Sequence, residues 1–323
     1  MTSSQDATVF HRWEWRAILQ DSFGHIPHYL LAERDGIIVG ALPLAEVKTL
    51  LFGHTLVSLP FCSWCGPVGV DTATVAALDA AAIELAERLG TDHLEYRHVE
   101  QTQFARPSQS LYVRFAKTMT EDHDQNLLAI PRKQRAMIRK GIRNNLRCEL
   151  GDVTDLYPLY TDNVHRHGTP ACPLDFFQNL KAGFGEDCEV RVVRDQKGKV
   201  VSTVLSLFHR NEVLPFYAGD HVSARNLAAN DFKYWELMRN AVDRGYLSFN
   251  YGRSKKGTGS FAFKKNWGFE PTQLQYEYWM PNGAEVPQRN TLNPKYRLMI
   301  DTWRRLPRAV VNIAGPYLVR GLG

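Results

Sequence analysis

Cysteine is scarce in this 323-residue chain, and its few cysteines follow no disulfide or zinc pattern. There are five of them, Cys62, Cys65, Cys148, Cys172 and Cys188. The odd count, and the lack of a basic N-terminal region followed by an apolar stretch, indicate a reducing cytoplasm. Cys62 and Cys65 form a lone CxxC with Gly66-Pro67 directly after it. We expect buried small residues in a turn there, not a zinc or redox site.

Long apolar runs are also missing, since no stretch reaches the ~18 apolar residues of a transmembrane helix. The chain lacks the Gly-x-x-x-x-Gly-Lys-Ser/Thr loop and the Gly-x-Ser-x-Gly elbow, which argues against a nucleotide-hydrolysing P-loop and a serine hydrolase. His165 and His167 flank Arg166, but no third metal ligand is nearby. We therefore predict no metal site and keep a substrate-lining role open for His167.

The elements that the sequence does predict occur twice in the same order. With 44% hydrophobic and 23% charged residues, the chain can form globular cores, and its length suits two domains of ~150 residues. In the first half we expect a hairpin over 28–46, an apolar run at 50–59, a helix over 72–89 capped by Thr72 or Thr74, and strands over 93–99 and 111–118.

The second half opens with helices over 131–145, 156–165 and 174–182 and then repeats this order. Strands are expected over 188–193, 200–209 and 213–218, followed by a polar loop over 219–230, a helix over 231–244, a strand over 246–251, a short helix within 256–268 and a long strand over 269–280. The fold class is α/β (α+β). We place a first domain at 1–120, a second at 121–290 and a basic amphipathic tail at 291–323.

Positive charge is concentrated in three stretches. Residues 131–147 hold seven Lys or Arg and no acid, residues 253–265 hold five and no acid, and residues 291–323 hold six against one Asp. Each stretch alone is also typical of a solvated helix face. Together they indicate an anionic partner: phosphate groups, RNA or an acidic membrane surface.

Four separated motifs resemble one known family. They are IPRKQRAMIRKGIRN, NDFKYWELM, FNYGRSKKGTGSFAFKKNWGFEP and the tail NPKYRLMIDTWRRLPRAVVNIAGPYLVRGLG. In this order they resemble FemAB-like acyltransferases, in particular the subgroup associated with the PEP-CTERM/exosortase system of exopolysaccharide-producing bacteria. The resemblance covers residues 120–323 by motif and the first domain by architecture only.

This resemblance implies two tandem GNAT-like domains, each a largely antiparallel mixed sheet flanked by helices, with the acyl donor over the second domain. Better-known members transfer an amino acid from aminoacyl-tRNA to an amine of a peptidoglycan precursor. Their donor-site Lys in Phe-Lys-x-x-Phe/Trp-Gly matches Lys264. The GNAT phosphate loop, Arg/Gln-x-x-Gly-x-Gly/Ala, matches residues 225–230, which keep Arg225 and small residues but not the glycines. A coenzyme A donor is weakened by this difference and stays open.

Acyl transfer needs a nucleophile, an acceptor for its proton and a site that stabilises the oxyanion. We expect Lys264 and Arg253 to stabilise charge, and Asp220 or His221 to take the proton. A solvated basic loop and a turn-stabilising Asp are the alternatives. The residues that we expect to bind substrate are Tyr217, Arg225, Asn230, Tyr251, Ser254 and His167.

The predicted function is transfer of an acyl or aminoacyl group to an amine or hydroxyl of a cell-envelope or exopolysaccharide precursor, such as a glycan or peptide. Acyl-CoA or aminoacyl-tRNA is the co-substrate, and no cofactor is tightly bound. The alternatives are a coenzyme A-dependent acyltransferase of a small molecule and a non-catalytic protein that binds RNA or an acidic glycan. We predict a cytoplasmic protein. Its tail either lies on the inner membrane face or packs back onto the first domain.

Overall fold

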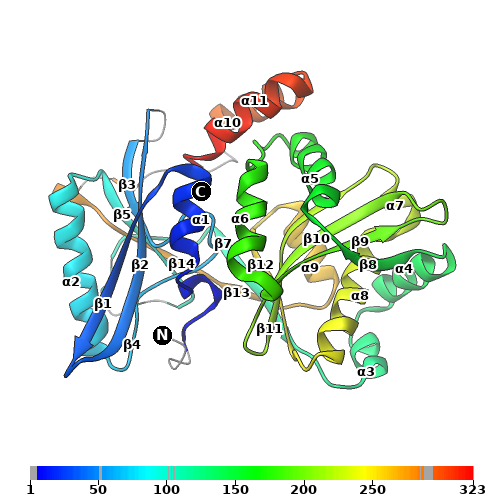
Figure 1. The fold of residues 1–323 in the computed structure, drawn as a ribbon, viewed down its shortest axis with the longest axis horizontal. Helices are drawn as coiled ribbons and strands as arrows, with labels where there is room; N and C mark the ends of the chain where they lie inside the picture. Colours follow the sequence, from blue (N-terminus) through cyan, green and yellow to red (C-terminus); the bar gives the residue numbers. More distant parts are fainter. Residues whose placement is uncertain are drawn as a thin grey trace. The chain divides into compact units, whose positions relative to one another are not determined.

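The chain divides into two compact units, and neither is a continuous stretch of sequence. The structure is a computed structural model that describes residues 6–50, 53–100, 102, 104, 106–283, 285–286 and 294–322. Unit 1 comprises Met1–Tyr112, Gln273–Thr291 and Tyr317–Gly323, and unit 2 comprises Val113–Thr272 and Leu292–Pro316. Each unit contains a mixed sheet with helices packed on it (Figure 1), which confirms the predicted α/β class.

Unit 1 is a seven-stranded sheet in the order β1-β2-β3-β5-β14-β6, with β4 paired to β2. Figure 1 shows α2 and α1 on opposite faces of this sheet. The α2 side chains Leu78, Ala82 and Leu85 pack on Leu42 and Leu56 of the sheet. The elements are η1 (Val9–His11), α1 (Trp15–Phe23), β1 (Ile26–Arg34), β2 (Ile37–Thr49), β3 (Gly53–Val57), β4 (Val68–Gly69), α2 (Thr72–Leu89), β5 (His93–His98), β6 (Ser108–Gln109), β14 (Gln275–Trp279) and η3 (Pro281–Gly283).

Helix α2 has the predicted bounds, but its N-cap residue differs from the prediction. Asp71, not a threonine, is the N-cap, because its side chain accepts a hydrogen bond from the amide of Thr74. The helix ends at Gly90, whose φ of 63° is the left-handed conformation that glycine adopts without strain.

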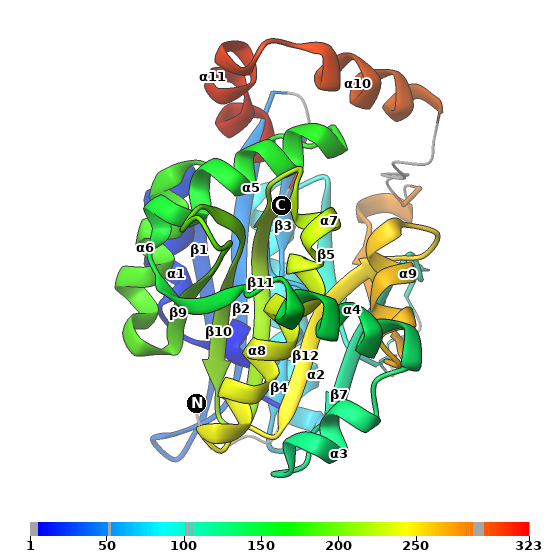
Figure 2. The same cartoon turned by 90° about the vertical axis from the view of Figure 1, so that its right-hand side faces the viewer.

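Unit 2 has a seven-stranded sheet in the order β13-β7-β12-β11-β10-β9-β8. Helices α5 and α6 lie on one face, and α8 and α4 lie on the other (Figures 1 and 2). The elements with most of their residues in this unit are β7 (Tyr112–Thr118), α3 (His123–Leu128), α4 (Arg132–Arg143), β8 (Arg147–Gly151), α5 (Val153–His167), α6 (Leu174–Phe184), η2 (Gly185–Asp187), β9 (Cys188–Arg194), β10 (Val200–His209), β11 (Glu212–Asp220), α7 (Ala224–Leu227), α8 (Ala229–Asp243), β12 (Ser248–Lys255), α9 (Gly259–Asn266), β13 (Pro271–Gln273), α10 (Pro294–Arg305) and α11 (Arg308–Val319).

Strands β7 and β14 are exchanged between the two sheets, relative to the prediction that each half of the sequence forms its own sheet. We predicted the strand at 111–118 for the first half, but β7 pairs within the sheet of unit 2. The single long strand predicted over 269–280 is divided into β13, in the sheet of unit 2, and β14, which pairs antiparallel with β5 in the sheet of unit 1. Hydrophobic patterning identifies a strand but not its partner, so the sequence could not reveal this exchange.

The C-terminal tail forms two helices, and α10 packs on α5 of unit 2. The backbone carbonyl of Trp303 lies 3.2 Å from Nε2 of His165, and Arg304 donates a hydrogen bond to the carbonyl of His167. Packing on the first domain was one of the two alternatives for the tail; α10 packs instead on α5, which lies in the predicted second domain. Within the described residues, no helix is both long enough and apolar enough to cross a bilayer.

Candidate functional site

Strands β11 and β12 of unit 2 pair only at their beginnings. They are parallel, and the registered pairs are Glu212 with Ser248 and Val213 with Phe249. Beyond these pairs β11 continues to Asp220 and β12 to Lys255. On its other side β11 carries a bulge at Phe216, because Leu205 pairs with Tyr217 and Ser206 with Pro215. Bulges re-aim side chains and often lie beside active sites, so the diverging part of these strands is the candidate site.

Asp220 ends β11 and forms an ion pair with Lys233 of α8. Nζ of Lys233 lies 3.0 Å from Oδ1 of Asp220, and Ser202 of β10 donates a hydrogen bond to the same oxygen. The Lys233 side chain is 0% exposed, whereas that of Asp220 is 26% exposed. The carboxylate is thus held by a buried cation and still reaches solvent. Sequence analysis predicted Asp220 but did not assign a role to Lys233.

Lys264 of α9 bonds to the part of β12 that no longer pairs with β11. Its Nζ donates hydrogen bonds to the carbonyls of Tyr251, at 2.6 Å, and Arg253, at 3.0 Å. Burial, and secondarily the Arg253 cation, lower the pKa of Lys264 to about 7. An ammonium group has three N–H donors, so the protonated form keeps one for a ligand. The neutral amine has no donor left once both carbonyls are bonded.

Aromatic rings lie between the Asp220–Lys233 ion pair and the Lys264 amine. Tyr234 of α8 lies beneath Nζ of Lys233, which is 4.8 Å from the ring centroid, and its own ring is 4.9 Å from that of Tyr251. Trp267 completes this cluster and donates a hydrogen bond to Asp231 at 3.0 Å, while burial raises the pKa of that carboxyl group. Among the described residues, the buried hydroxyls of Tyr251 and Ser254 have no hydrogen-bond partner. Two buried donors without partners are what a polar ligand would satisfy.

Three of the predicted residues lie in other surroundings. Tyr217 packs edge-on against Tyr160, Phe176 and Phe177 of α5 and α6, on the opposite face from α8. His221 lies in the turn after β11. Its two ring nitrogens are 3.0 Å from Nζ of Lys199 and 2.8 Å from the hydroxyl of Ser223.

His167 ends α5 beneath α10, and burial, together with the Arg166 and Arg304 cations, lowers its pKa. The contacts of these three residues give them structural partners, and their binding roles stay predictions.

The segment predicted as the phosphate loop is partly helical. It was expected to be a polar loop over 219–230, but α7 and the start of α8 occupy its second half. Arg225 is exposed on α7, and Asn230 lies half-buried in the first turn of α8. Ala228 joins the two helices with a φ of 59°. Ala228 occupies the position of the first glycine in the GNAT pattern. Its backbone has the left-handed conformation that favours glycine, although the residue is alanine.

Replacing Ala228 with glycine should therefore stabilise the protein. An L-residue in the left-handed region is strained by about 1 kcal/mol or more, and glycine is not. We expect a gain of about 1 kcal/mol in the free energy of unfolding, measured by urea denaturation. The matched control is Ala241→Gly in the interior of α8, whose side chain is also buried; this variant should lose about 1 kcal/mol. Equal losses in both variants would contradict the strain at Ala228.

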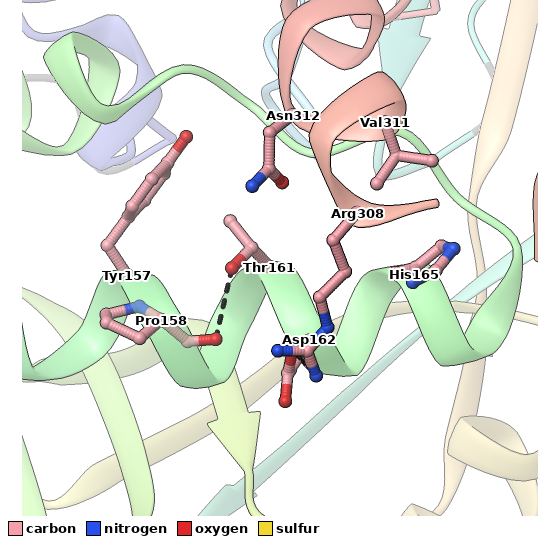
Figure 3. A pocket seen from close by; sticks show the side chains of 8 residues that line it. All are labelled: Tyr157, Pro158, Thr161, Asp162, His165, Arg308, Val311 and Asn312. Atoms are coloured by element: carbon pink, nitrogen blue, oxygen red, sulfur yellow. Dashed lines mark hydrogen bonds and ion pairs between the residues drawn. The ribbon is translucent and has the colours of Figure 1, made fainter. Parts of the chain in front are cut away.

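A separate pocket of about 280 Å³ lies between α5 and α11 in unit 2. Figure 3 shows its lining, with Arg308 of α11 reaching Asp162 of α5. Of the two histidines considered for a metal site, His165 lines this pocket. In the described part of the chain, no group of three or more His, Cys, Asp or Glu side chains is arranged to hold a metal ion.

Comparisons with known proteins find a family match within unit 2. Residues 132–265 match the family model of an acetyltransferase (GNAT) domain, and this segment contains Asp220, Lys233 and Lys264. A UDP-N-acetylmuramoylpentapeptide-lysine N(6)-alanyltransferase from Weissella viridescens is 26% identical over 106 residues. The match covers 32% of this chain, and it spans about a third (32%) of the length of that relative.

Among solved structures, a crystal structure of FemX superposes with a TM-score of 0.67 at 14% identity, covering 93% of this chain and 96% of that one. The C-terminal domain of a proposed lysylphosphatidylglycerol synthetase from Agrobacterium fabrum superposes with a TM-score of 0.58 at 15% identity, covering 91% and 93%. At these identities the two structures show the fold alone. Residues 132–265 are thus similar to a GNAT acetyltransferase domain, and the chain shares the fold of FemX.

Proposed function

We propose that this protein transfers an acyl or aminoacyl group to an amine or hydroxyl of a cell-envelope or exopolysaccharide precursor. The observation that carries the proposal is the divergence of β11 and β12, with Asp220 at the end of β11 and half-buried Lys264 bonded to the carbonyls of β12. The acceptor nucleophile attacks the donor carbonyl, Asp220 takes its proton, and Lys264 donates its third N–H to the oxyanion. Collapse of the intermediate then releases the donor's oxygen or sulfur leaving group.

The surroundings of the site favour aminoacyl-tRNA as the donor. The first turn of α8 carries the Asp231 carboxyl group, which competes with a phosphate for that helix start. Helix α4 lies close against α8, because a Cβ on Gly141 would be only 2.7 Å from Cβ of Phe232. Its exposed residues include four cations, Arg132, Lys133, Arg139 and Arg143. A basic helix beside the site suits a polyanion better than a single pyrophosphate.

Coenzyme A is the second candidate donor. The left-handed backbone at Ala228 keeps the chain path that the GNAT phosphate pattern requires, and Arg225 is exposed next to it. In this case Arg225 would contact the pyrophosphate.

The acceptor is proposed from the relatives. The Weissella protein is named for alanyl transfer to a lysine of a UDP-linked muramoylpentapeptide, and the name of the Agrobacterium protein refers to a lipid. Both names concern envelope components, and the resemblance to the exosortase-associated subgroup suggests an exopolysaccharide precursor instead of a muropeptide.

Donor binding distinguishes the alternatives. We would titrate the protein with acetyl-coenzyme A, a longer acyl-coenzyme A and aminoacyl-tRNA, with Lys264→Ala and Arg225→Ala alongside. We expect saturable binding of aminoacyl-tRNA, weakened at high salt and lost in Lys264→Ala. Coenzyme A binding that is lost in Arg225→Ala would replace the tRNA proposal. Binding of tRNA or glycan without turnover would favour a non-catalytic protein, and no binding of any donor would refute the proposal.

A further inference from the structure

Helix α11 is apolar on two sides, and only one of them is covered. Val311, Gly315 and Val319 recur every four residues and are buried. Val310, Ile313 and Tyr317 recur at i, i+3 and i+7 on another side, and they are 44%, 71% and 79% exposed. A helix that is apolar on more than one face is usually buried on all of them, so the second face needs a partner.

The tail is held to α5 by contacts other than this exposed set. Figure 3 shows Val311 and Arg308 of α11 facing the pocket on α5, and Arg308 forms an ion pair with Asp162 at 2.5 Å. Helix α10 is bonded to the same support through the Trp303 carbonyl, which lies 3.2 Å from Nε2 of His165, and the Trp303 side chain is buried. Its own outward residues Leu298 and Met299 are 72% and 60% exposed. The outward side chains therefore take no part in the contacts that hold the tail on α5.

The charge beside these apolar side chains is positive. Between residues 298 and 322 the sequence has four arginines, at 304, 305, 308 and 320, against one acid, Asp301. Arg304, Arg305 and Arg308 are exposed between the two apolar sets. Guanidinium groups bind phosphate, and exposed aliphatic and tyrosine side chains suit the boundary between lipid headgroups and acyl chains. Five apolar side chains are few compared with the roughly 20 residues on each side of a specific protein interface.

We infer that this set, the tail surface (Leu298, Met299, Arg304, Arg305, Val310, Ile313 and Tyr317), docks the protein on an anionic lipid bilayer. The tail lies on the headgroup layer with its apolar side chains inserted and does not span it. Membrane docking is independent of the proposed acyl transfer, because no residue of the tail surface belongs to the site at β11 and β12.

Sedimentation with vesicles tests the tail surface. Full-length protein would be mixed with vesicles of phosphatidylcholine alone or with about one third phosphatidylglycerol, at low and high salt. We expect binding to the anionic vesicles that weakens with salt, because screening shortens the reach of the arginines. Ile313→Ser combined with Tyr317→Ser should lower the partition coefficient about tenfold or more. Arg305→Gln should lower it about fivefold.

The matched control is Leu150→Ser on β8, because the Leu150 side chain is 65% exposed and the Ile313 side chain is 71% exposed. It should bind vesicles like the wild type, and donor binding should be unchanged in every tail variant. Equal partitioning of wild type and the Ile313/Tyr317 variant would overturn the inference. So would a concentration-dependent dimer that the same substitutions abolish, because a second copy of the chain would then cover the surface.

Discussion

Replacement of Lys264 by methionine is expected to lower kcat/KM by about 100-fold or more. Methionine keeps the length of the side chain but removes the N–H that would reach the oxyanion, and loss of one such donor typically costs 10²–10³ in rate. The measurement is turnover with the donor that binds, compared at saturating acceptor. Lys265→Met is the matched control, since Lys265 is the next residue and is exposed. Similar losses in both variants would show that only the basic charge of the segment matters.

The pH dependence separates two roles for Lys264. With a pKa of about 7, the ammonium form dominates below pH 7 and is lost above it. If Lys264 donates to the oxyanion, kcat/KM in the wild type should fall as pH rises from 7 to 9. A rise over this range that depends on Lys264 would instead make the neutral amine a general base and would contradict the proposed role.

Stability provides a second readout with a definite sign. Folding lowers this pKa from 10.5, so between pH 7 and 10.5 the unfolded chain binds more protons at Lys264 than the folded chain does. Folding stability therefore rises with pH across this window. Below pH 7 Lys264 is charged in the folded chain, and the full cost of keeping that charge in its desolvated site is present. We expect the Tm of the wild type, relative to the Tm of Lys264→Met, to increase between pH 7 and pH 9. A pH-independent difference would show that Lys264 has an ordinary pKa.

Asp220→Ala is expected to destabilise the protein by about 3–5 kcal/mol, the usual cost of leaving one partner of a buried pair alone. The two partners are not equivalent, because Lys233 is 0% exposed and Asp220 is 26% exposed. Without Asp220 a fully buried ammonium group loses its counter-charge. Without Lys233 the carboxylate can still bond to Ser202 and to water, so Lys233→Met should cost less, about 1–2 kcal/mol.

Urea denaturation of both single variants and of the double variant measures this asymmetry. The double variant Asp220→Ala with Lys233→Met should recover most of the stability that Asp220→Ala loses, because the unpaired buried charge is gone. The control is Arg239→Ala, which breaks the exposed pair with Glu236 and should cost less than about 1 kcal/mol. Additive losses in the double variant would show that Lys233 and Asp220 do not depend on each other.

The sequence was sufficient for much of the fold, because helix and strand periodicity is a local property. The 72–89 helix, the hairpins and the strand that leads to Asp220 follow from it. The partners of strands β7 and β14 do not, since pairing is set by contacts more than a hundred residues apart.

At the site, Lys264 and Asp220 were predicted and Lys233 was not. A signal for it exists in the sequence. Lys233 lies in a row of every fourth residue with Ala229, Leu237 and Ala241, all of them 0% exposed. A lysine within such an apolar row indicates a buried cation whose partner must come from another element. The partner itself, and the aromatic contact between Tyr234 and Tyr251, are tertiary and could not be read from spacing.

The exchange of strands has a consequence for synthesis on the ribosome. The sheet of unit 1 places β14, residues Gln275–Trp279, between β5 and β6. When the first 120 residues have emerged, β5 therefore has an edge without its neighbour, and open strand edges are where chains join one another. The order in which this sheet is completed is not the order in which its strands are translated. The edge of β5 is covered only by β14, which is translated about 180 residues later. During synthesis this edge therefore stays open until most of the chain has been made.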